Sequence, residues 1–387
     1  MKKFWGYIKQ YKIRFCFLGG LIFLFFLLFG LRYITDVSEF WTTTIGRAYQ
    51  TVIGFLTSLI PISFLELFII ATIAYVVCWI VFFVIKTKKQ GFKKSSVKIV
   101  NLFVVLFSVL TIYMGTAGMA YHREPLNLHL RDTSVVSQDD YYNISLWATE
   151  KLNACAAQLE FDQTGSVKKP YSDKELYNKI KEEYAKIDGN YLTKFSANPK
   201  QLRFFGWLYT ELNISGVSFL PTGEANYNQY VPNIDLPFVV AHELAHTKGV
   251  MSEDEANNLA MYVCINSTDP YLQYSALCNA YESIEPMAQT SNDDEKVDQF
   301  FAKLDNRVWK DFAYSNDFWA GHTFFKDLSE WFNNLYLKIF GSQTTDAYID
   351  HTDSDVVIID EEPVFVLNSL SPYQKILVDY WLKENGH

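Results

Sequence analysis

Three long apolar segments dominate the first part of the chain. They cover about residues 15–33, 65–85 and 99–120, and each is long enough to cross a hydrocarbon core of about 30 Å as a helix. The second and third contain a single charged side chain, Glu66, near one end. Buried helices of a soluble protein are rarely so free of charge. We therefore predict a multi-pass α-helical membrane anchor over residues 1–120, whose first segment is a retained transmembrane helix because no small-residue cleavage site follows it.

Basic residues beside these segments predict the orientation. Five Lys and Arg side chains precede the first segment, and six Lys side chains fill the connection between the second and third. Such flanks remain in the cytoplasm, so three crossings place residues 121–387 outside it, as an extracytoplasmic domain of a multi-pass cell-membrane protein. The charge also divides there: residues 1–120 hold 13 basic and 3 acidic side chains, whereas the other 267 residues hold 21 and 40. An acidic domain of this kind is not expected to bind nucleic acid, and the lipid bilayer is the expected partner of the anchor.

A further apolar segment, at about residues 45–61, has its large side chains at helical spacing and ends at Pro61. It fits a helix that lies in the membrane interface or one that re-enters the bilayer, and the sequence leaves both open.

The remaining chain predicts a mainly α-helical α+β domain with a small sheet. Amphipathic helices are expected at residues 139–159, 173–187, 201–212 and 372–384, a partly helical charged stretch at 291–305, and a loop at 342–362. The only convincing strand is 217–220, to which residues 224–230 can return antiparallel after Pro-Thr-Gly.

Cysteine is too sparse to hold this domain together. Cys155, Cys264 and Cys278 lie outside the apolar segments, with no paired metal-ligand spacing. Cys264 and Cys278 fit either one disulfide bridge or two buried free thiols.

The chemistry is concentrated in a His-Glu-x-x-His motif at residues 242–246. An apolar helix is expected to carry it, with Asp235 as N-cap and Pro237 in the first turn. His242 and His246 are then one turn apart on the same face, so both imidazoles can bind a single Zn²⁺. Glu243 lies beside the metal, where it can take a proton from water.

A catalytic zinc site needs a third protein ligand, and the acidic start of the next expected helix offers three. Ser252 and Glu255 fit a capping box, which leaves Glu253 free to bind the metal. Glu255 and Asp254 remain alternatives. If Glu253 is the ligand, Asn257 lies one turn further on the same face and can hold a ligand histidine through its second nitrogen.

Several motifs carry a resemblance to known proteins. They are Phe219-Leu220-Pro221-Thr222-Gly223-Glu224-Ala225-Asn226-Tyr227-Asn228, Pro232, Leu236-Pro237-Phe238, His242-Glu243-Leu244-Ala245-His246, Gly249, Glu253-Asp254-Glu255-Ala256-Asn257 and Ile60-Pro61-Ile62-Ser63. With three N-terminal apolar segments, this chain resembles the bacterial membrane protein family catalogued as domain of unknown function 3810. More distantly, its histidine motif followed by Glu-x-x-Ala-Asn is similar to the Glu-zincin metallopeptidases, in which Asp commonly stands at the position of Asn257.

The zincin resemblance implies a zincin-like fold and Zn²⁺ bound by His242, His246 and Glu253. It also implies hydrolysis of a peptide bond by zinc-activated water, with Glu243 removing the proton and returning it to the leaving amine.

The substrate peptide would add as an extended strand beside residues 217–230, as in zincins. Glu224 or Asn226 would then line the substrate cleft. The alternative is that both belong to a tight turn with polar caps.

We therefore expect a membrane-anchored zinc metalloprotease that acts on a peptide or protein substrate outside the cytoplasm. The alternative is a non-catalytic or weakly catalytic sensor or assembly protein that uses the zincin fold to bind peptides or membrane partners. Cleavage within the bilayer is not expected, because the motif helix has only about 12 residues and lies more than 100 residues beyond the last apolar segment.

Overall fold

The computed structural model describes residues 11–131, 135–187, 189–291, 293–340, 356–359, 362–366 and 370–385. Within these residues, three helices are long and apolar enough to cross a membrane: α2 (Lys12–Leu31), α5 (Phe64–Gln90) and α7 (Val97–Thr116). They confirm the three predicted segments. The boundaries differ in two places, since α5 continues through the lysines after residue 85, and α7 gives way to a 3-10 turn, η2 (Gly118–His122), before residue 120.

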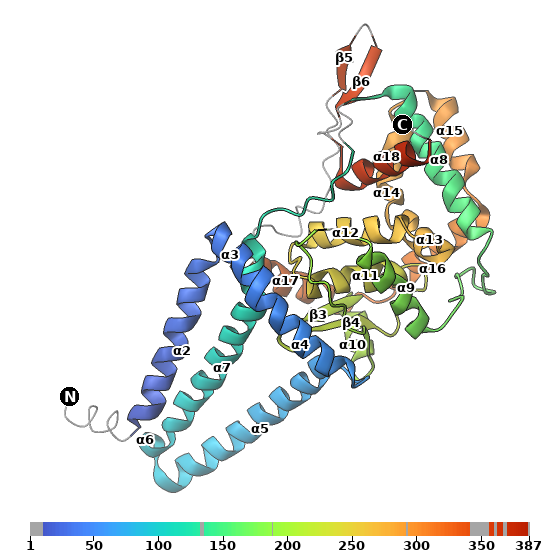
Figure 1. Cartoon of the computed structure of the whole chain (residues 1–387). Helices are drawn as coiled ribbons and strands as arrows, with labels where there is room; N and C mark the ends of the chain where they lie inside the picture. The colour runs from blue at the N-terminus through green and yellow to red at the C-terminus, as the bar shows by residue number, and fades with distance from the viewer. Residues whose placement is uncertain are drawn as a thin grey trace.

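The three apolar helices are arranged in two arms (Figure 1). One arm is the pair α2 and α7, which contact each other along their length, with the rings of Phe25 and Phe107 6.0 Å apart. The other arm is α5, which joins α7 through the short helix α6 (Phe92–Ser95) and diverges from it toward the domain. The most apolar window of α5 buries none of its residues against protein. Its exposed apolar side chains suit contact with lipid.

Three elements connect α2 to α5: α3 (Thr35–Trp41), the π-helix η1 (Thr42–Gly46) and α4 (Arg47–Ser58). The polar side of α4 is bonded to the carbonyls of residues 220–222 in the domain, from the Tyr49 hydroxyl (2.6 Å), the Gln50 amide (3.0 Å) and the Thr57 hydroxyl (2.9 Å). Its apolar side, with Val52, Phe55 and Leu56, is exposed. These bonds hold α4 at the base of the domain, which favours the interfacial of the two expected arrangements.

The domain is mostly helical. Its helices are α8 (Gln138–Ala156), α9 (Asp173–Ala185), α10 (Gly206–Glu211), α11 (Leu236–Thr247), α12 (Glu253–Ile265), α13 (Pro270–Asn279), α14 (Tyr281–Gln289), α15 (Asp294–Lys303), α16 (Asn306–Ala320), α17 (Lys326–Phe340) and α18 (Pro372–Glu384). Its strands are β1 (Val135–Ser137), β2 (Lys200–Leu202), β3 (Gly216–Phe219), β4 (Glu224–Asn228), β5 (Val356–Ile359) and β6 (Glu362–Val366). A 3-10 turn, η3 (Leu220–Thr222), joins β3 to β4.

A small mixed sheet lies beside the motif helix. Its strand order is β2-β4-β3, with β3 antiparallel to β4 and β2 parallel to it. The predicted hairpin is confirmed, with Val217 opposite Asn226. The buried helices α11, α12 and α13 pack against one another and form the centre of the core. Cys264 and Cys278 are buried there as free thiols, so the predicted disulfide alternative is not formed.

Two segments were predicted wrongly. Residues 201–212 are not one helix, because residues 200–202 form β2 beside β4 and the helix α10 begins only at Gly206. Residues 356–359 and 362 belong to strands β5 and β6 of an antiparallel sheet with β1, and not to a loop. Strand β2 has only three residues and pairs with β4, about 26 residues further along the chain, which periodicity does not reveal. Strands β5 and β6 form a hairpin with each other, and β6 pairs in addition with the distant β1. The rest of the predicted loop, 342–355 and 360–361, lies outside the described residues.

Two buried carboxylates fix the start of α5 in the domain. Glu224 accepts hydrogen bonds from the backbone N–H groups of residues 64 and 65, both at 3.1 Å, and pairs with Lys200. Glu66 accepts bonds of 2.8–3.0 Å from the N–H groups of residues 203–205. The N–H groups of residues 64 and 65, in the first turn of α5, have no partner within the helix, and Glu224 satisfies them. The ion pair of Glu224 with Lys200 lies within the sheet, and loss of one partner of a buried pair typically costs about 3–5 kcal/mol.

Candidate metal centre

The motif helix α11 presents its histidines from an otherwise buried element. Every residue of α11 except His242 is buried, as expected for a helix that is apolar all round. Pro237 is in the first turn as predicted, but the Asp235 side chain forms no cap bond and instead accepts a hydrogen bond from the Ser315 hydroxyl at 2.9 Å. The chain leaves the helix at Gly249, whose φ of +94° is readily adopted only by glycine.

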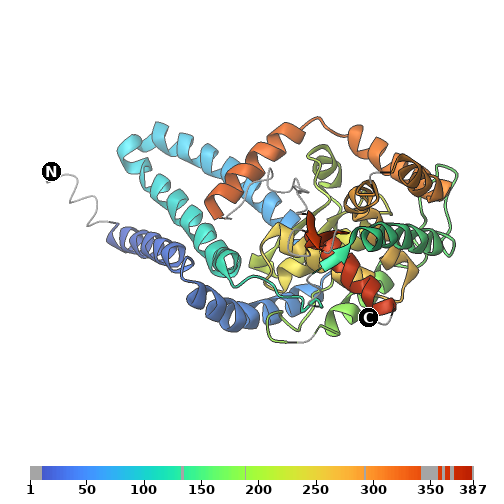
Figure 2. The ribbon, with the colours of Figure 1, turned by 90° about the horizontal axis from the view of Figure 1, so that it is seen from above.

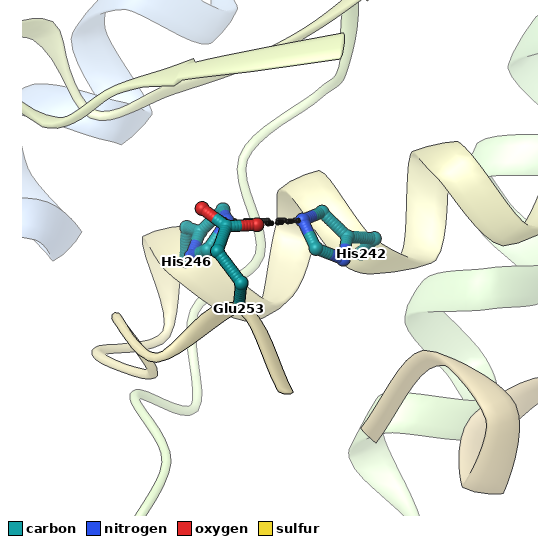
Figure 3. Close-up of side chains that lie close together, drawn as sticks. All are labelled: His242, His246 and Glu253. Atoms are coloured by element: carbon teal, nitrogen blue, oxygen red, sulfur yellow. Dashed lines mark hydrogen bonds and ion pairs between the residues drawn. The ribbon is translucent and has the colours of Figure 1, made fainter. Parts of the chain in front are cut away.

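The return of the chain after Gly249 brings Glu253, the first residue of α12, to the two histidines (Figure 3). The Nε2 atoms of His242 and His246 are 3.1 Å apart. The carboxylate of Glu253 lies 3.1 Å from Nε2 of His242 and 3.6 Å from Nε2 of His246. Three potential ligand atoms therefore converge on one point from two helices.

These separations fit a tetrahedral zinc site. Ligand atoms about 2.0–2.2 Å from a tetrahedral Zn²⁺ are about 3.3–3.6 Å from one another. The two histidine nitrogens are 3.1 Å apart, and the Glu253 oxygens Oε2 and Oε1 lie 3.1 Å from the His242 nitrogen and 3.6 Å from the His246 nitrogen, respectively. One ligand atom from each of the three residues lies within 4.8 Å of the others, so the cluster is compact enough for one ion. Two imidazoles and one carboxylate are also a donor set of catalytic zinc sites, which keep the fourth position open for water. The Glu253 side chain is 32% exposed, so solvent reaches this side of the cluster.

The tautomer of His246 suits a cation at this position. Its Nδ1 lies 2.8 Å from the Val250 carbonyl oxygen, which can only accept, so Nδ1 carries the hydrogen. The Nε2 of the neutral ring then presents a lone pair to the Glu253 carboxylate. Without a metal, burial lowers the pKa of His246, but the charge of Glu253 outweighs it and raises that pKa to about 9. Conversely, burial raises the pKa of Glu253, and His246 and His242 bring it below its usual range.

The geometry distinguishes among the three acidic residues. Of the described residues, the group that could hold a metal ion consists of His242, His246 and Glu253 and does not include Glu255 or Asp254. Glu255 accepts a hydrogen bond from the backbone N–H of Leu126 at 2.8 Å. The capping box predicted for Ser252 and Glu255 is absent, since Ser252 makes no side-chain cap bond.

Asn257 does not have the predicted contact with a histidine. Among the residues that the structure describes, its side chain has no hydrogen-bond partner, and neither does the buried Nδ1 of His242. The backbone carbonyl of Val250 orients His246 instead. A carbonyl can fill this outer position as well as a carboxylate can.

Glu243 points from α11 toward the edge strand β3. It is buried, and the Ser218 hydroxyl lies 2.8 Å from its Oε2. Burial raises its pKa, against the effect of His242 and His246. A carboxylate with a raised pKa beside a metal site is suited to accept a proton and return it.

Comparison with known proteins identifies the family. Residues 41–348 match the family described as Protein of unknown function (DUF3810), which is most of the chain. The chain belongs to this family. The match includes α5, α7, the histidine motif and Glu253, and it confirms the family resemblance seen in the sequence. Searches of the curated proteins and of the solved structures each found no match.

The structure of this family member places Glu224 and Asn226 away from any cleft. They are 1% and 0% exposed. The Glu224 carboxylate accepts a hydrogen bond from the first N–H of α5 and forms an ion pair with Lys200. The Asn226 amide donates to the Val217 carbonyl at 3.1 Å. Their prediction as cleft residues was wrong, and the polar-cap alternative describes them. A cleft was predicted because a substrate peptide was expected to pair beside residues 217–230. The contact of Glu224 with α5 joins residues about 160 positions apart, and the sequence does not show it.

Two residues that contact Glu243 were not predicted from the sequence. One is Ser218, and the other is Gly216, at which an added Cβ would lie 2.7 Å from Cγ and 2.8 Å from Cδ of Glu243. A glycine inside a strand often marks a close approach of this kind, which is the signal that could have identified it.

We expect Gly216→Ala to displace the Glu243 carboxylate and to reduce hydrolysis by about tenfold or more, because misplacement of a reacting group by 1 Å can cost about 100-fold. The measurement is the rate of peptide hydrolysis at saturating zinc, with zinc content determined in parallel. Gly321→Ala is the matched control, at a glycine remote from the site. Wild-type activity in Gly216→Ala would show that Glu243 does not need its present position.

Proposed function

We propose that this protein is a membrane-anchored, zinc-dependent metalloprotease with a zincin-like catalytic domain. The observation that carries the proposal is the convergence of His242, His246 and Glu253 to within 4.8 Å of one another, with Glu243 next to them in α11. The histidines and Glu253 would hold the ion. Because basic flanks favour a cytoplasmic N-terminus, we place this domain outside the cytoplasm.

A bound Zn²⁺ supplies two effects in such a site: it lowers the pKa of water and polarises a carbonyl group. Glu243 would take the proton from that water and deliver it to the leaving amine, helped by its raised pKa. Ser218 would hold one of its oxygens through the bond at 2.8 Å. His246 would be kept in the metal-binding tautomer by the Val250 carbonyl.

Strand β3 offers a place for the substrate. It is at the edge of the sheet β2-β4-β3, its residues are half-buried, and Glu243 lies against its Gly216. An extended peptide that pairs with such an edge is fixed by backbone hydrogen bonds. This arrangement would carry a peptide bond past the metal and the base.

The alternative of a sensor or assembly protein explains less. Binding a peptide or a membrane partner requires no buried carboxylate beside the metal. Burial of a carboxylate costs free energy. Glu243 is nevertheless buried, with the Ser218 hydroxyl bonded to it and Gly216 leaving it room. A role in proton transfer accounts for this cost, whereas a binding function does not.

Metal removal tests the proposal. We expect the full-length protein to contain about one zinc per chain and to cleave an unfolded polypeptide, to lose cleavage with a chelator, and to regain it on addition of zinc. Metal analysis and fragment mapping by mass spectrometry are the measurements. A folded protein that binds no zinc after exposure to it would refute the metal site, and a zinc-bound protein that cleaves no sequence in a broad peptide library would favour the binding function.

A further inference from the structure

Helix α17 exposes an apolar face that no part of the described chain covers. The exposed side chains are Leu328, Trp331, Phe332, Leu335 and Ile339, with Phe324 just before the helix, and they are 41–80% exposed. Their spacing of three and four residues puts them on one side of the helix. Asp327, Glu330 and Asn333 occupy the other side and are also exposed. A contiguous exposed apolar face of this kind indicates a binding surface.

The contacts of α17 place it beside the ends of α2 and α7 that are nearest the domain. Arg32, the residue after α2, donates to the Ile339 carbonyl at 2.8 Å. The Tyr336 hydroxyl bonds to the hydroxyls of Tyr113, near the end of α7, and Tyr121, just beyond it. In the view of Figure 2, α17 runs across α5, and one of its ends lies near the end of α7. It therefore lies where these helices meet the domain.

The chemistry at this position matches the surface of a bilayer. With 15 residues, α17 is about 22 Å long, which is too short to cross a hydrocarbon core of about 30 Å. An amphipathic helix with Trp, Phe and Leu on one face and charged groups on the other lies in the interface plane. The hydroxyl of Tyr336 in α17 bonds to Tyr113 of α7, a helix whose length and composition suit a membrane.

The loop of the candidate metal centre contacts the same region, just beyond α2 and α7. The loop that joins its two helices contains Gly249, whose carbonyl accepts a hydrogen bond from Arg123 at 2.8 Å, while Arg123 is paired with Glu39 of α3 at 2.9 Å. The same loop contains Met251, which packs in a cluster with Ala117 and Ala120, directly after α7. The metal loop is therefore held by residues that follow the apolar helices within a few positions.

We propose that α17 lies in the membrane interface on the side of the catalytic domain, and that the metal centre acts there on membrane-tethered polypeptides, at the segment that adjoins a transmembrane helix. The substrate class rests on the proposed protease function, whereas the position of α17 does not. The proposal differs from cleavage inside the bilayer, since the metal loop is bound beyond the ends of α2 and α7 and not along them.

The position of α17 can be measured in the full-length protein in lipid nanodiscs. With the exposed Cys16 and Cys78 replaced by alanine, a single cysteine that carries an environment-sensitive fluorophore is introduced by Phe332→Cys or, as matched control, Glu330→Cys. We expect blue-shifted emission and quenching by nitroxide-labelled lipids at position 332 and water-like emission at 330. Water-like emission at both positions would overturn the proposal. Protection at 332 that appears only with two protein copies per disc would also overturn it, because a second copy would then cover the face.

The substrate class is tested with one cleavable sequence in two tethered forms. In the first, the sequence directly follows a transmembrane helix in the same disc, and in the second a long flexible linker separates them, so that both are concentrated at the membrane. We expect faster cleavage of the first form by about tenfold, and loss of this preference in Trp331→Ser/Phe332→Ser. Equal cleavage by zinc-bound wild type would refute the substrate class and leave the protease function standing. Cleavage of neither form, nor of a soluble unfolded polypeptide, would refute the protease function itself, while the fluorescence measurement still decides the position of α17.

Discussion

Glu243→Gln is expected to remove peptide hydrolysis and to leave the zinc in place. The carboxylate adjoins the metal ligands but is not one of the three converging groups, so its loss removes the proton acceptor without opening the metal site. Glutamine has nearly the same shape and can still accept the bond from Ser218. A general base contributes about 10²–10⁴-fold to the rate, and we expect a decrease of that size. The measurements are the rate of hydrolysis at saturating substrate and zinc content per chain.

Glu282→Gln serves as the control, because Glu282 is exposed at the start of α14. It should keep the wild-type rate and zinc content. If Glu243→Gln retains most of the activity, the base must be another group, and the role assigned to the buried carboxylate is wrong. If Glu243→Gln loses zinc, Glu243 supports the metal, and its role in proton transfer is not separated from that support. The variant Glu243→Asp, which keeps the charge but shortens the side chain, then distinguishes the two roles by its zinc content.

Glu253→Ala should deprive the site of its metal, whereas Glu255→Gln should not. Loss of an outer partner of a metal ligand weakens binding by about 10–100-fold, and loss of one of three ligands should exceed that. The Glu255 side chain serves another purpose, the bond to the N–H of Leu126, which glutamine can also accept. Competition with a fluorescent zinc chelator measures both affinities. The reverse pattern, weak binding in Glu255→Gln and wild-type binding in Glu253→Ala, would contradict the geometry.

Thermal unfolding of both variants without metal provides the control for stability. The charge of Glu253 lies against two imidazoles, and in the metal-free protein it raises the pKa of His246 to about 9. A raised pKa stabilises the fold below the unfolded-state value and loses this effect as the pH rises through about 9. The metal-free Glu253→Ala protein should therefore be less stable than wild type near pH 6, with a smaller difference above pH 9.

Several features follow from the sequence because they depend on neighbouring residues. The three apolar segments are detectable by length and lack of charge, and α2, α5 and α7 confirm them. The spacing of His242 and His246 fixes their common face once a helix is assumed, and the helix ends at Gly249 for a local reason, its positive φ. The hairpin of β3 and β4 is equally local, since four residues, 220–223, connect its strands.

Other features were settled only by contacts between distant residues. The sequence left Glu253, Asp254 and Glu255 open as ligands, because all three lie in the first turn of the helix that follows the motif. In the fold, Glu255 accepts a hydrogen bond from the backbone N–H of Leu126, and Glu253 lies against the histidines. In the same way, Glu224 was assigned to a cleft, since nothing near it in the sequence reveals that its partners are residues 64 and 65.

The position of the candidate metal centre next to the apolar helices also depends on contacts between distant residues. By sequence, the motif lies more than 100 residues beyond the last apolar segment, and that distance was one reason not to expect cleavage within the bilayer. In the fold, Arg123 and Met251 join the metal loop to residues that directly follow α2 and α7. Local patterns thus identified the two histidines of the candidate metal centre and the helices that are long and apolar enough to cross a membrane, because periodicity and charge act over a few turns. Only tertiary packing, which is independent of separation along the chain, decided that these two parts of the protein meet.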